Sequence, residues 1–278
     1  MVWKHKSPAI IHAPAEALDK YGNLRIGGGL PSPRRMMMAA ASAGGAFTPD
    51  AAVSDPDNDS CMLRGGDWTG AVDGSNGLFS CWVRFNGGDG GYHYLLSDVG
   101  YRLYVCKDTD NRLYIYTRTS GSAALVTLRS NSTLTADATW HHICGSWNGT
   151  VCHLWIDGLQ DEDIASINAG TCDHTVADHG LLGTVTKSSI VDADVAELYL
   201  ALEYLDISDA SELEKFRSSG GEAVDLGADG STPTGNQPIV YCHLPDGGTA
   251  DTEFNNQNGS GGTYTVYGSF GETDGPNG

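Results

Sequence analysis

The chain has 278 residues and a formal net charge of −19, with 40% hydrophobic and only 18% charged residues. The negative charge disfavours nucleic-acid binding, because that affinity depends largely on neutralising phosphates. There is no run of about 18 apolar residues, so we expect no membrane insertion, and the N-terminus lacks the apolar core of a secretory signal. The 37 glycines and 10 prolines indicate many turns, so we expect a soluble, unexported chain rich in strands.

Residues 1–60 are predicted to form an extended, Pro/Gly-rich arm. They hold six of the ten prolines and show no sustained hydrophobic periodicity. Proline interrupts both helices and central strands, so the one helix expected is short, at 14–20, while 36–41 is expected to form either a second turn or a small apolar plug. Such a segment cannot bury a core of its own, and we expect it to become ordered only against another surface.

The arm and the rest of the chain differ in charge. Residues 1–38 carry six basic and two acidic residues, a balance of +4, which leaves −23 for residues 39–278. This asymmetry favours an anchor for a negatively charged surface, with a basic tail that has no partner as the alternative. Exposed ion pairs contribute only about 0–1 kcal/mol each, so apolar side chains are expected to dominate the attachment. The candidate docking residues are Ile10, Ile11, Arg25, Leu30, Arg34, Arg35, Met36, Met37 and Met38.

Residues 61–245 show short strand patterns at close intervals. In 78–85 every second residue is apolar, which gives a strand with one wholly apolar face. Further strands are expected at 92–97, 103–107, 113–117, 124–128, 140–147, 151–156 and 195–202. Asn148-Gly149 predicts a hairpin between two of them, and 195–202 is apolar enough for a central strand covered on both faces. One short helix is expected at 208–216, with Ser208 as its N-cap.

The last segment, 246–278, contains nine glycines and an Asn-rich stretch. Only 263–267 has a strand pattern, and the sequence leaves open whether it lies in a flexible tail or forms an edge strand. The predicted organisation is therefore an arm (1–60), a body (61–245) and a Gly/Asn-rich tail (246–278). Eight to ten short strands predict an all-β, antiparallel two-sheet jelly-roll sandwich.

Seven cysteines are scattered through the body. Zinc sites usually show closely paired cysteines, and no C-x-x-C pair is present. The odd count and the missing export signal also argue against a disulfide framework. We expect reduced thiols that pack as small apolar groups.

Several motifs in the body resemble one known family. They are 63–70 (Leu-Arg-Gly-Gly-Asp-Trp-Thr-Gly), 79–84, the Trp140-His141-His142-Ile143 segment with 144–149, 154–158 and 224–235. Over about 50–245 the chain resembles the concanavalin A-like lectin/glucanase superfamily, specifically laminin-G-like members from phage virions. The resemblance implies a jelly-roll fold. Independently, we expect Trp140, Trp147 and Trp155 to pack between the sheets, and His141 and His142 to be structural residues on opposite faces of a strand.

The sequence does not predict an enzyme. A glucanase of this superfamily would need paired carboxylates on one strand face, in an E-x-D-x-x-E pattern that is absent. The cluster at 161–163 is interpreted as a solvated loop. Asp192 and Asp194 share strand parity, whereas Glu197 is expected on the other face. No catalytic or cofactor-binding residue is proposed.

Two acidic clusters could hold calcium, at 55–59 and at 108–111. Both offer oxygen ligands suited to a hard cation, but neither follows EF-hand spacing. Asp and Asn are also ordinary turn residues, so turns are the favoured interpretation and no metal site is assigned.

These observations favour a non-enzymatic phage virion structural protein, such as a capsid decoration or cement protein, or a tail-associated one. Its expected partners are the major capsid protein or other virion proteins and further copies of itself, in a virion assembled in the host cytoplasm. The alternative is a carbohydrate-binding adhesin for host surface glycans. An exposed aromatic in a cleft beside ordered Asp or Asn side chains would favour that alternative. A polysaccharide depolymerase would need the missing carboxylate pair.

Overall fold

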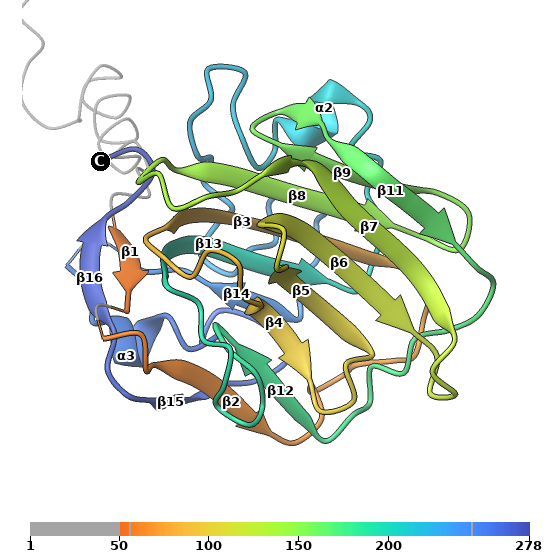
Figure 1. The fold of residues 1–278 in the computed structure, drawn as a ribbon, viewed down its shortest axis with the longest axis horizontal. Helices are drawn as coiled ribbons and strands as arrows, with labels where there is room; N and C mark the ends of the chain where they lie inside the picture. The colour runs from red at the N-terminus through yellow and green to blue at the C-terminus, as the bar shows by residue number, and fades with distance from the viewer. Residues whose placement is uncertain (1–50, 56, 246) are drawn as a thin grey trace, which may run out of the picture. The chain divides into compact units, whose positions relative to one another are not determined.

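Two antiparallel β-sheets face each other in the computed structural model, which describes residues 51–55, 57–245 and 247–278 (Figure 1). Sheet 1 has the order β10-β9-β8-β3-β13-β1-β16, and β14 also pairs with β13. Its strands are β1 (Ala51–Ser54), β3 (Gly77–Phe85), β8 (His141–Trp147), β9 (Cys152–Ile156), β10 (Leu159–Gln160), β13 (Ala193–Ala201), β14 (Val240–Cys242) and β16 (Gly271–Asp274).

Sheet 2 has the order β11-β7-β6-β5-β4-β12-β2-β15. Its strands are β2 (Cys61–Gly65), β4 (His93–Asp98), β5 (Leu103–Lys107), β6 (Arg112–Arg118), β7 (Ala124–Thr133), β11 (Glu162–Ile167), β12 (Asp178–Leu181) and β15 (Thr265–Tyr267). The all-β two-sheet prediction is confirmed. The described residues form sixteen strands rather than eight to ten, because several are too short to show a periodic pattern.

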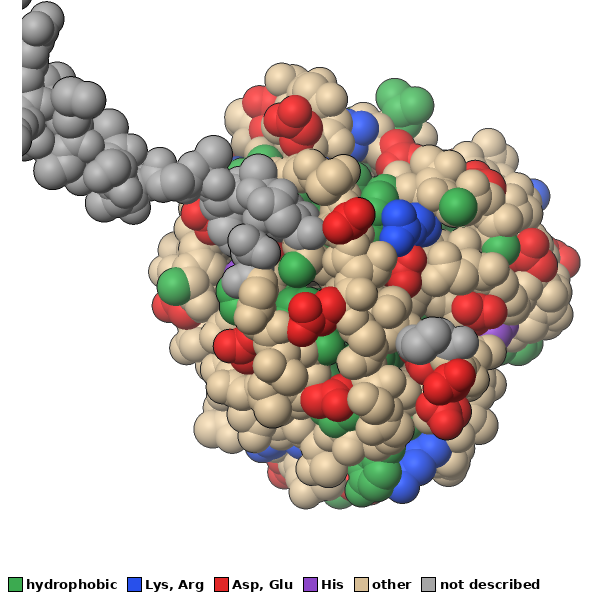
Figure 2. Space-filling model, turned by 90° about the vertical axis from the view of Figure 1, so that its left-hand side faces the viewer, with side chains coloured by type: hydrophobic (Ala, Val, Ile, Leu, Met, Phe, Trp, Pro, Cys, Tyr) green, Lys and Arg blue, Asp and Glu red, His purple; other side chains and the backbone are tan. Residues whose placement is uncertain are grey.

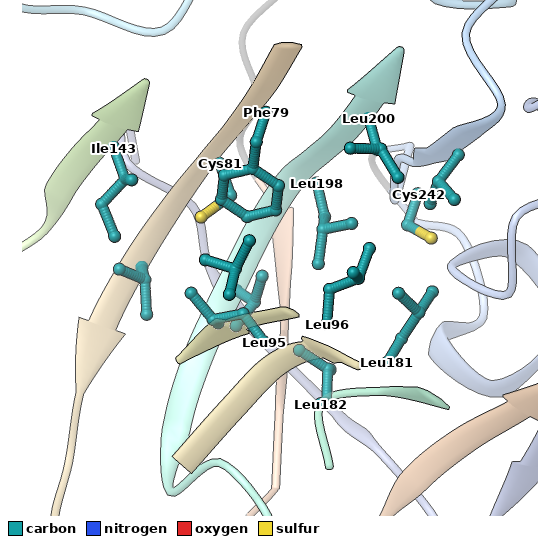
Figure 3. Packing of buried hydrophobic residues seen from close by; sticks show 14 of the residues in the cluster. Phe79, Cys81, Leu95, Leu96, Ile143, Leu181, Leu182, Leu198, Leu200 and Cys242 are labelled. Carbon is teal, nitrogen blue, oxygen red and sulfur yellow. The ribbon is translucent and has the colours of Figure 1, made fainter. Parts of the chain in front are cut away.

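The core lies between the sheets and follows from strand alternation. Phe79 and Cys81 of β3 point inward beside Leu198 of β13, and Leu96 and Leu181 meet them from sheet 2 (Figure 3). All five side chains are fully buried. Burial of each large apolar side chain contributes about 1.5–3 kcal/mol, so this layer holds the two sheets together.

The outer face of sheet 1 is covered by a second apolar layer. Tyr199 and Tyr241 lie on this face and are fully buried under Phe216 and Leu226, which belong to the segment 202–230. All nine residues of β13 are therefore buried, which confirms the expectation of a central strand covered on both faces.

The predicted helix at 208–216 is shorter than expected. Only α2 (Ala210–Leu213) is helical, and its N-cap is Asp209, whose side chain accepts a hydrogen bond from the Ser211 N–H. The Asp206 carboxylate binds both the backbone and the hydroxyl of Ser208. Ser208 is thus held in a turn before the helix and cannot act as the cap.

The predicted hairpin at Asn148-Gly149 is confirmed, because β8 and β9 pair directly around it. The C-terminal segment resolves the alternative left open by the sequence. It contains α3 (Ala250–Glu253), and β15 pairs with β2 while β16 pairs with β1, both as edge strands. β1 itself begins at Ala51, inside the segment that the sequence assigns to the arm.

A β-bulge in β13 changes the orientation of Glu197. The register shifts between Ala196 and Tyr199, and Glu197 has a φ of 51°. Its carboxylate accepts a hydrogen bond from the Tyr241 hydroxyl at 2.8 Å on the outer side of sheet 1. The expectation that Glu197 points away from the Asp194 face was wrong, because the extra residue of a bulge breaks strict alternation.

All seven cysteines lie in the described part of the chain and are free, and six of them are buried. Within the same part of the chain, the structure contains no helix that is long and apolar enough to cross a membrane.

Candidate functional site

The outer face of sheet 2 carries a row of tyrosines. In β6 the core residues Leu113 and Ile115 alternate with Tyr114 and Tyr116, which are only half-buried. Successive side chains of a strand point to opposite faces, so the tyrosines project away from the core. Neighbouring strands and turns add four more. The tyrosine face comprises Tyr92, Tyr94, Tyr101, Tyr104, Tyr114 and Tyr116, carried by residues in and beside β4, β5 and β6 (Figure 1).

Tyr104 of β5 lies at the centre of this face. It is directly opposite Tyr116 in the sheet, and their ring centroids are 5.1 Å apart in a stacked arrangement. Tyr114 stacks on it at 5.9 Å, and Tyr94 meets it edge-on at 5.8 Å. Such aromatic pairs contribute about 0.5–1.5 kcal/mol beyond area burial, so the rings support one another in fixed orientations.

The turn between β4 and β5 holds Tyr101 in place. The Asp98 carboxylate accepts hydrogen bonds from the backbone N–H groups of Gly100, Arg102 and Leu103, at 2.8–2.9 Å. Tyr101 has a φ of 51°, an uncommon conformation for a residue with a side chain. Burial raises the pKa of Asp98, although these three backbone donors act in the opposite direction.

The tyrosines surround a shallow depression of about 260 Å³. It is lined by Tyr94, Tyr101, Tyr104, Tyr116 and Arg118. Tyr101 is 39% exposed, so its ring forms an accessible wall of the depression. The volume lies below the 300–1,000 Å³ typical of pockets for drug-sized ligands, and the site therefore fits one small ring rather than an extended molecule.

Three phenols of this face stay protonated at neutral pH because of burial. Burial raises the pKa of Tyr94 to about 12 and also raises the pKa values of Tyr104 and Tyr114. Each of these three hydroxyls can therefore both donate and accept a hydrogen bond, which suits a ligand with many hydroxyl groups.

Ion pairs border the tyrosine face. The Arg102 guanidinium pairs with Asp173, and Arg112 pairs with Asp163 at 2.6 Å. Arg129 pairs with Asp108, and its Nε lies 3.0 Å from the Asp108 Oδ2. These pairs place charges of both signs around the aromatic surface.

In the two acidic clusters considered for calcium, carboxylates accept hydrogen bonds from backbone N–H groups of the same turns. The Asp108 Oδ1 atom accepts the N–H groups of Asp110 and Arg112, both at 2.9 Å. The Asp55 carboxylate accepts the N–H of Ser60 at 2.8 Å. Among residues 51–55, 57–245 and 247–278, no group of three His, Cys, Asp or Glu side chains could hold a metal ion.

The acidic stretch 161–163 is not a solvated loop. Asp161 is buried and accepts the backbone N–H groups of Asn131 and Ser132 at 3.0 Å. Glu162 begins β11, and its carboxylate accepts the N–H of Leu154 at 2.9 Å. The prediction was wrong because these carboxylates pair with backbone donors of neighbouring strands rather than with water.

His141 and His142 lie on opposite faces of the strand, as predicted. Burial lowers the pKa of His142 to about 3, and its Nε2 is 3.0 Å from the Ser80 hydroxyl. The Nδ1 of His141 lies 2.7 Å from Asp157, and this hydrogen bond raises the His141 pKa.

The three tryptophans do not share one environment. Trp147 packs between the sheets as expected. Trp155 and Trp140 are half-buried and pack instead against apolar clusters on the outer side of sheet 1. The arm residues predicted to dock lie outside the described residues: Ile10, Ile11, Arg25, Leu30, Arg34, Arg35, Met36, Met37 and Met38.

Comparison with known proteins agrees with this architecture. Residues 62–196, which include the whole tyrosine face, match the family described as the concanavalin A-like lectin/glucanases superfamily. A solved structure from Bacteroides ovatus superposes with a TM-score of 0.55 at 8% identity, covering 82% of this chain. The body therefore has the same overall two-sheet sandwich fold as that protein. The chain spans 60% of the length of that Bacteroides ovatus protein.

Two further solved structures are less similar to this chain. A heptameric SAP-like pentraxin from Limulus polyphemus is 10% identical with a TM-score of 0.44, covering 61% of this chain and 83% of the pentraxin. Domains LG4-5 of the mouse laminin α1 chain are 14% identical with a TM-score of 0.41, and the match covers 58% of this chain and 45% of the laminin structure. A search of curated proteins gives no match.

Sequence reasoning missed the tyrosine face. The strands that carry it were predicted, and the alternation of apolar residues with tyrosine at 113–117 was visible. The signal that could have found the site is the group of tyrosines at outward positions of two adjacent strands, Tyr104 in one and Tyr114 and Tyr116 in the next, where a solvated face usually has charged residues.

Proposed function

We propose that the protein is a non-catalytic carbohydrate-binding sandwich and that the tyrosine face receives the glycan. The observation that carries this proposal is the set of stacked, partly exposed rings around a small depression on a sheet face that the described residues leave open. The apolar C–H face of a sugar ring can pack flat on a phenol, while the phenol hydroxyl bonds the sugar hydroxyls. Tyrosine also offers a large contact area at a low cost in conformational entropy.

Fold similarity is compatible with this proposal. The Bacteroides ovatus protein of the same fold is provisionally described as carbohydrate binding. A fold does not by itself imply a function, so the proposal rests on the tyrosines and not on the likeness. A single shallow depression is expected to bind weakly, and the homo-oligomer predicted from the sequence would raise the avidity by multivalency.

A glycan array followed by calorimetry tests the proposal. Tyr104→Ala should weaken binding of any glycan found on the array by about tenfold or more, because Tyr104 contacts most of the other rings. The matched control is Tyr267→Ala, an exposed tyrosine on the edge strand β15, which should leave binding unchanged. An array without any bound glycan, or equal binding by both variants, would overturn the proposal.

We further propose that the arm anchors the body in a phage particle. The support is the charge balance of +4 in residues 1–38 against −23 in the remainder. Figure 2 shows carboxylates scattered over one side of the sandwich with few basic side chains among them. Deleting residues 1–38 should leave a folded sandwich that no longer joins particles. Wild-type occupancy by the truncated protein would instead place the docking surface on the body.

A further inference from the structure

We infer that the tyrosine face selects an acidic sugar and that Arg118 binds its carboxylate. This inference rests on the proposed carbohydrate binding and adds the class of ligand. Arg118 follows Tyr114 and Tyr116 at the next outward position of β6, and it lines the depression together with four tyrosines. Among the described residues, it is the only basic side chain that lines this depression.

The other arginines of this face have acidic partners. Arg102 pairs with Asp173, Arg112 with Asp163, and Arg129 with Asp108 and Asp110. These three guanidinium groups are therefore already neutralised by carboxylates of the protein. A ligand carboxylate would have to compete with those partners, so these residues are poor candidates for binding it.

Arg118 differs from them, because no carboxylate of the described residues pairs with it. Its Nη2 donates a hydrogen bond to the carbonyl of Gly100, and its Nε is buried without a hydrogen-bond partner. A guanidinium has five N–H donors, so most of its donor capacity is unused. The Gly100 contact ties the side chain to the turn that carries Tyr101 and fixes it in place.

This arrangement suits a sugar that carries a carboxylate. The planar guanidinium matches the geometry of a carboxylate, and a bond between two charged groups is stronger than one between neutral groups. A pyranose packed against Tyr104 and Tyr116 would bring its substituents near Arg118, which lines the same depression. The rings would bind the sugar, and Arg118 would make the site selective for acidic over neutral sugars.

The net charge of the chain decides which probe is informative. At −19 the protein repels long polyanions, and this repulsion opposes the local attraction of Arg118. Short oligosaccharides in 0.15 M salt reduce that effect, since the Debye length is then about 8 Å. We therefore choose trigalacturonate and sialyllactose as probes, with their methyl esters as uncharged counterparts of equal shape.

Calorimetry with the full chain tests the inference. Each acid that binds should do so about tenfold more tightly than its methyl ester. Arg118→Gln should remove this preference, so that acid and ester bind with equal affinity, and Arg118→Lys should restore part of it. The matched control is Arg112→Gln, which lies outside the depression and should keep the preference.

The outcomes separate the two proposals. Equal affinity for acid and ester, or binding of sulfated sugars alone, would overturn the assignment of an acidic sugar. If acid and ester bind equally well and Tyr104→Ala abolishes the binding of both, carbohydrate binding stands while the role of Arg118 fails. If neither acids nor esters bind, the acidic-sugar inference fails, and the glycan array decides separately whether carbohydrate binding stands. The comparison of acid with ester in the wild-type protein needs no variant, so it remains decisive even if Arg118→Gln does not fold.

Discussion

The two sheets carry tyrosines on their outer faces, but the described part of the chain covers only one of these faces. On sheet 1, Tyr199 and Tyr241 are fully buried beneath Phe216 and the segment around it. On sheet 2, Tyr104 and Tyr116 are half-buried and line an open depression. The same residue type is thus buried on one face and partly exposed on the other, because the segment 202–230 packs over the first face.

The largest expected effect comes from opening the covered face. Phe216→Ala removes a fully buried ring that packs edge-on against Tyr199, with ring centroids 5.3 Å apart. It should lower the free energy of unfolding by about 3–5 kcal/mol. Tyr116→Ala should cost far less, about 1 kcal/mol, because its ring is partly exposed already. Urea unfolding measures both. Similar losses for the two variants would mean that the tyrosine face is a structural layer and not a free surface.

Acid should destabilise the covered face next. Burial lowers the pKa of His142 to about 3, whereas an exposed histidine titrates near 6.5. The unfolded chain therefore binds more protons, and stability is complete above pH 6.5 and falls as the pH drops toward 3. His142 alone should cost about 2 kcal/mol between pH 7 and pH 5. His142→Gln should reduce the acid-induced loss by this amount, and an unchanged loss would assign the effect to His174 and His179, whose pKa values are also lowered.

This contrast could be predicted from the sequence only in part. The alternation at 78–85 identified a strand and its inner face, and 113–117 was predicted as a strand, because burial of apolar side chains is a local pattern. Which outer face is covered depends on where the segment 202–230 packs, and that depends on contacts between residues far apart in the chain. The prediction of the Glu197 orientation was wrong for a related reason, since nothing in the local sequence marks the bulge. Asp161 was misassigned because its backbone partners, Asn131 and Ser132, lie about thirty residues away.

A smaller effect is expected when the turn that carries Tyr101 is loosened, and it should appear in glycan affinity. Asp98→Asn removes part of the acceptor capacity that fixes the turn around Tyr101, and it should lower stability by about 1 kcal/mol. Because Tyr101 then loses its fixed position, glycan affinity should fall by about threefold to tenfold. The control is Asp229→Asn, the same change in a turn outside the tyrosine face, where the carboxylate accepts the N–H of Ser231. If both variants bind glycan as the wild type does, the position of Tyr101 is irrelevant to recognition.

The smallest effect is expected at the charged border of the tyrosine face. Arg112 of β6 reaches Asp163 of β11 across β7, at 2.6 Å, and both side chains are partly exposed. Such pairs contribute about 0–1 kcal/mol, so Arg112→Gln should barely change the free energy of unfolding, and 1 M salt should remove the difference. Arg129 lies 3.7 Å from the same carboxylate and can take over the pairing, which lowers the cost further. A double-mutant cycle with Asp163→Asn should give a coupling energy below about 0.5 kcal/mol. A large coupling energy, or loss of glycan binding in Arg112→Gln alone, would extend the ligand footprint over the border and make the ion pairs part of the recognition surface.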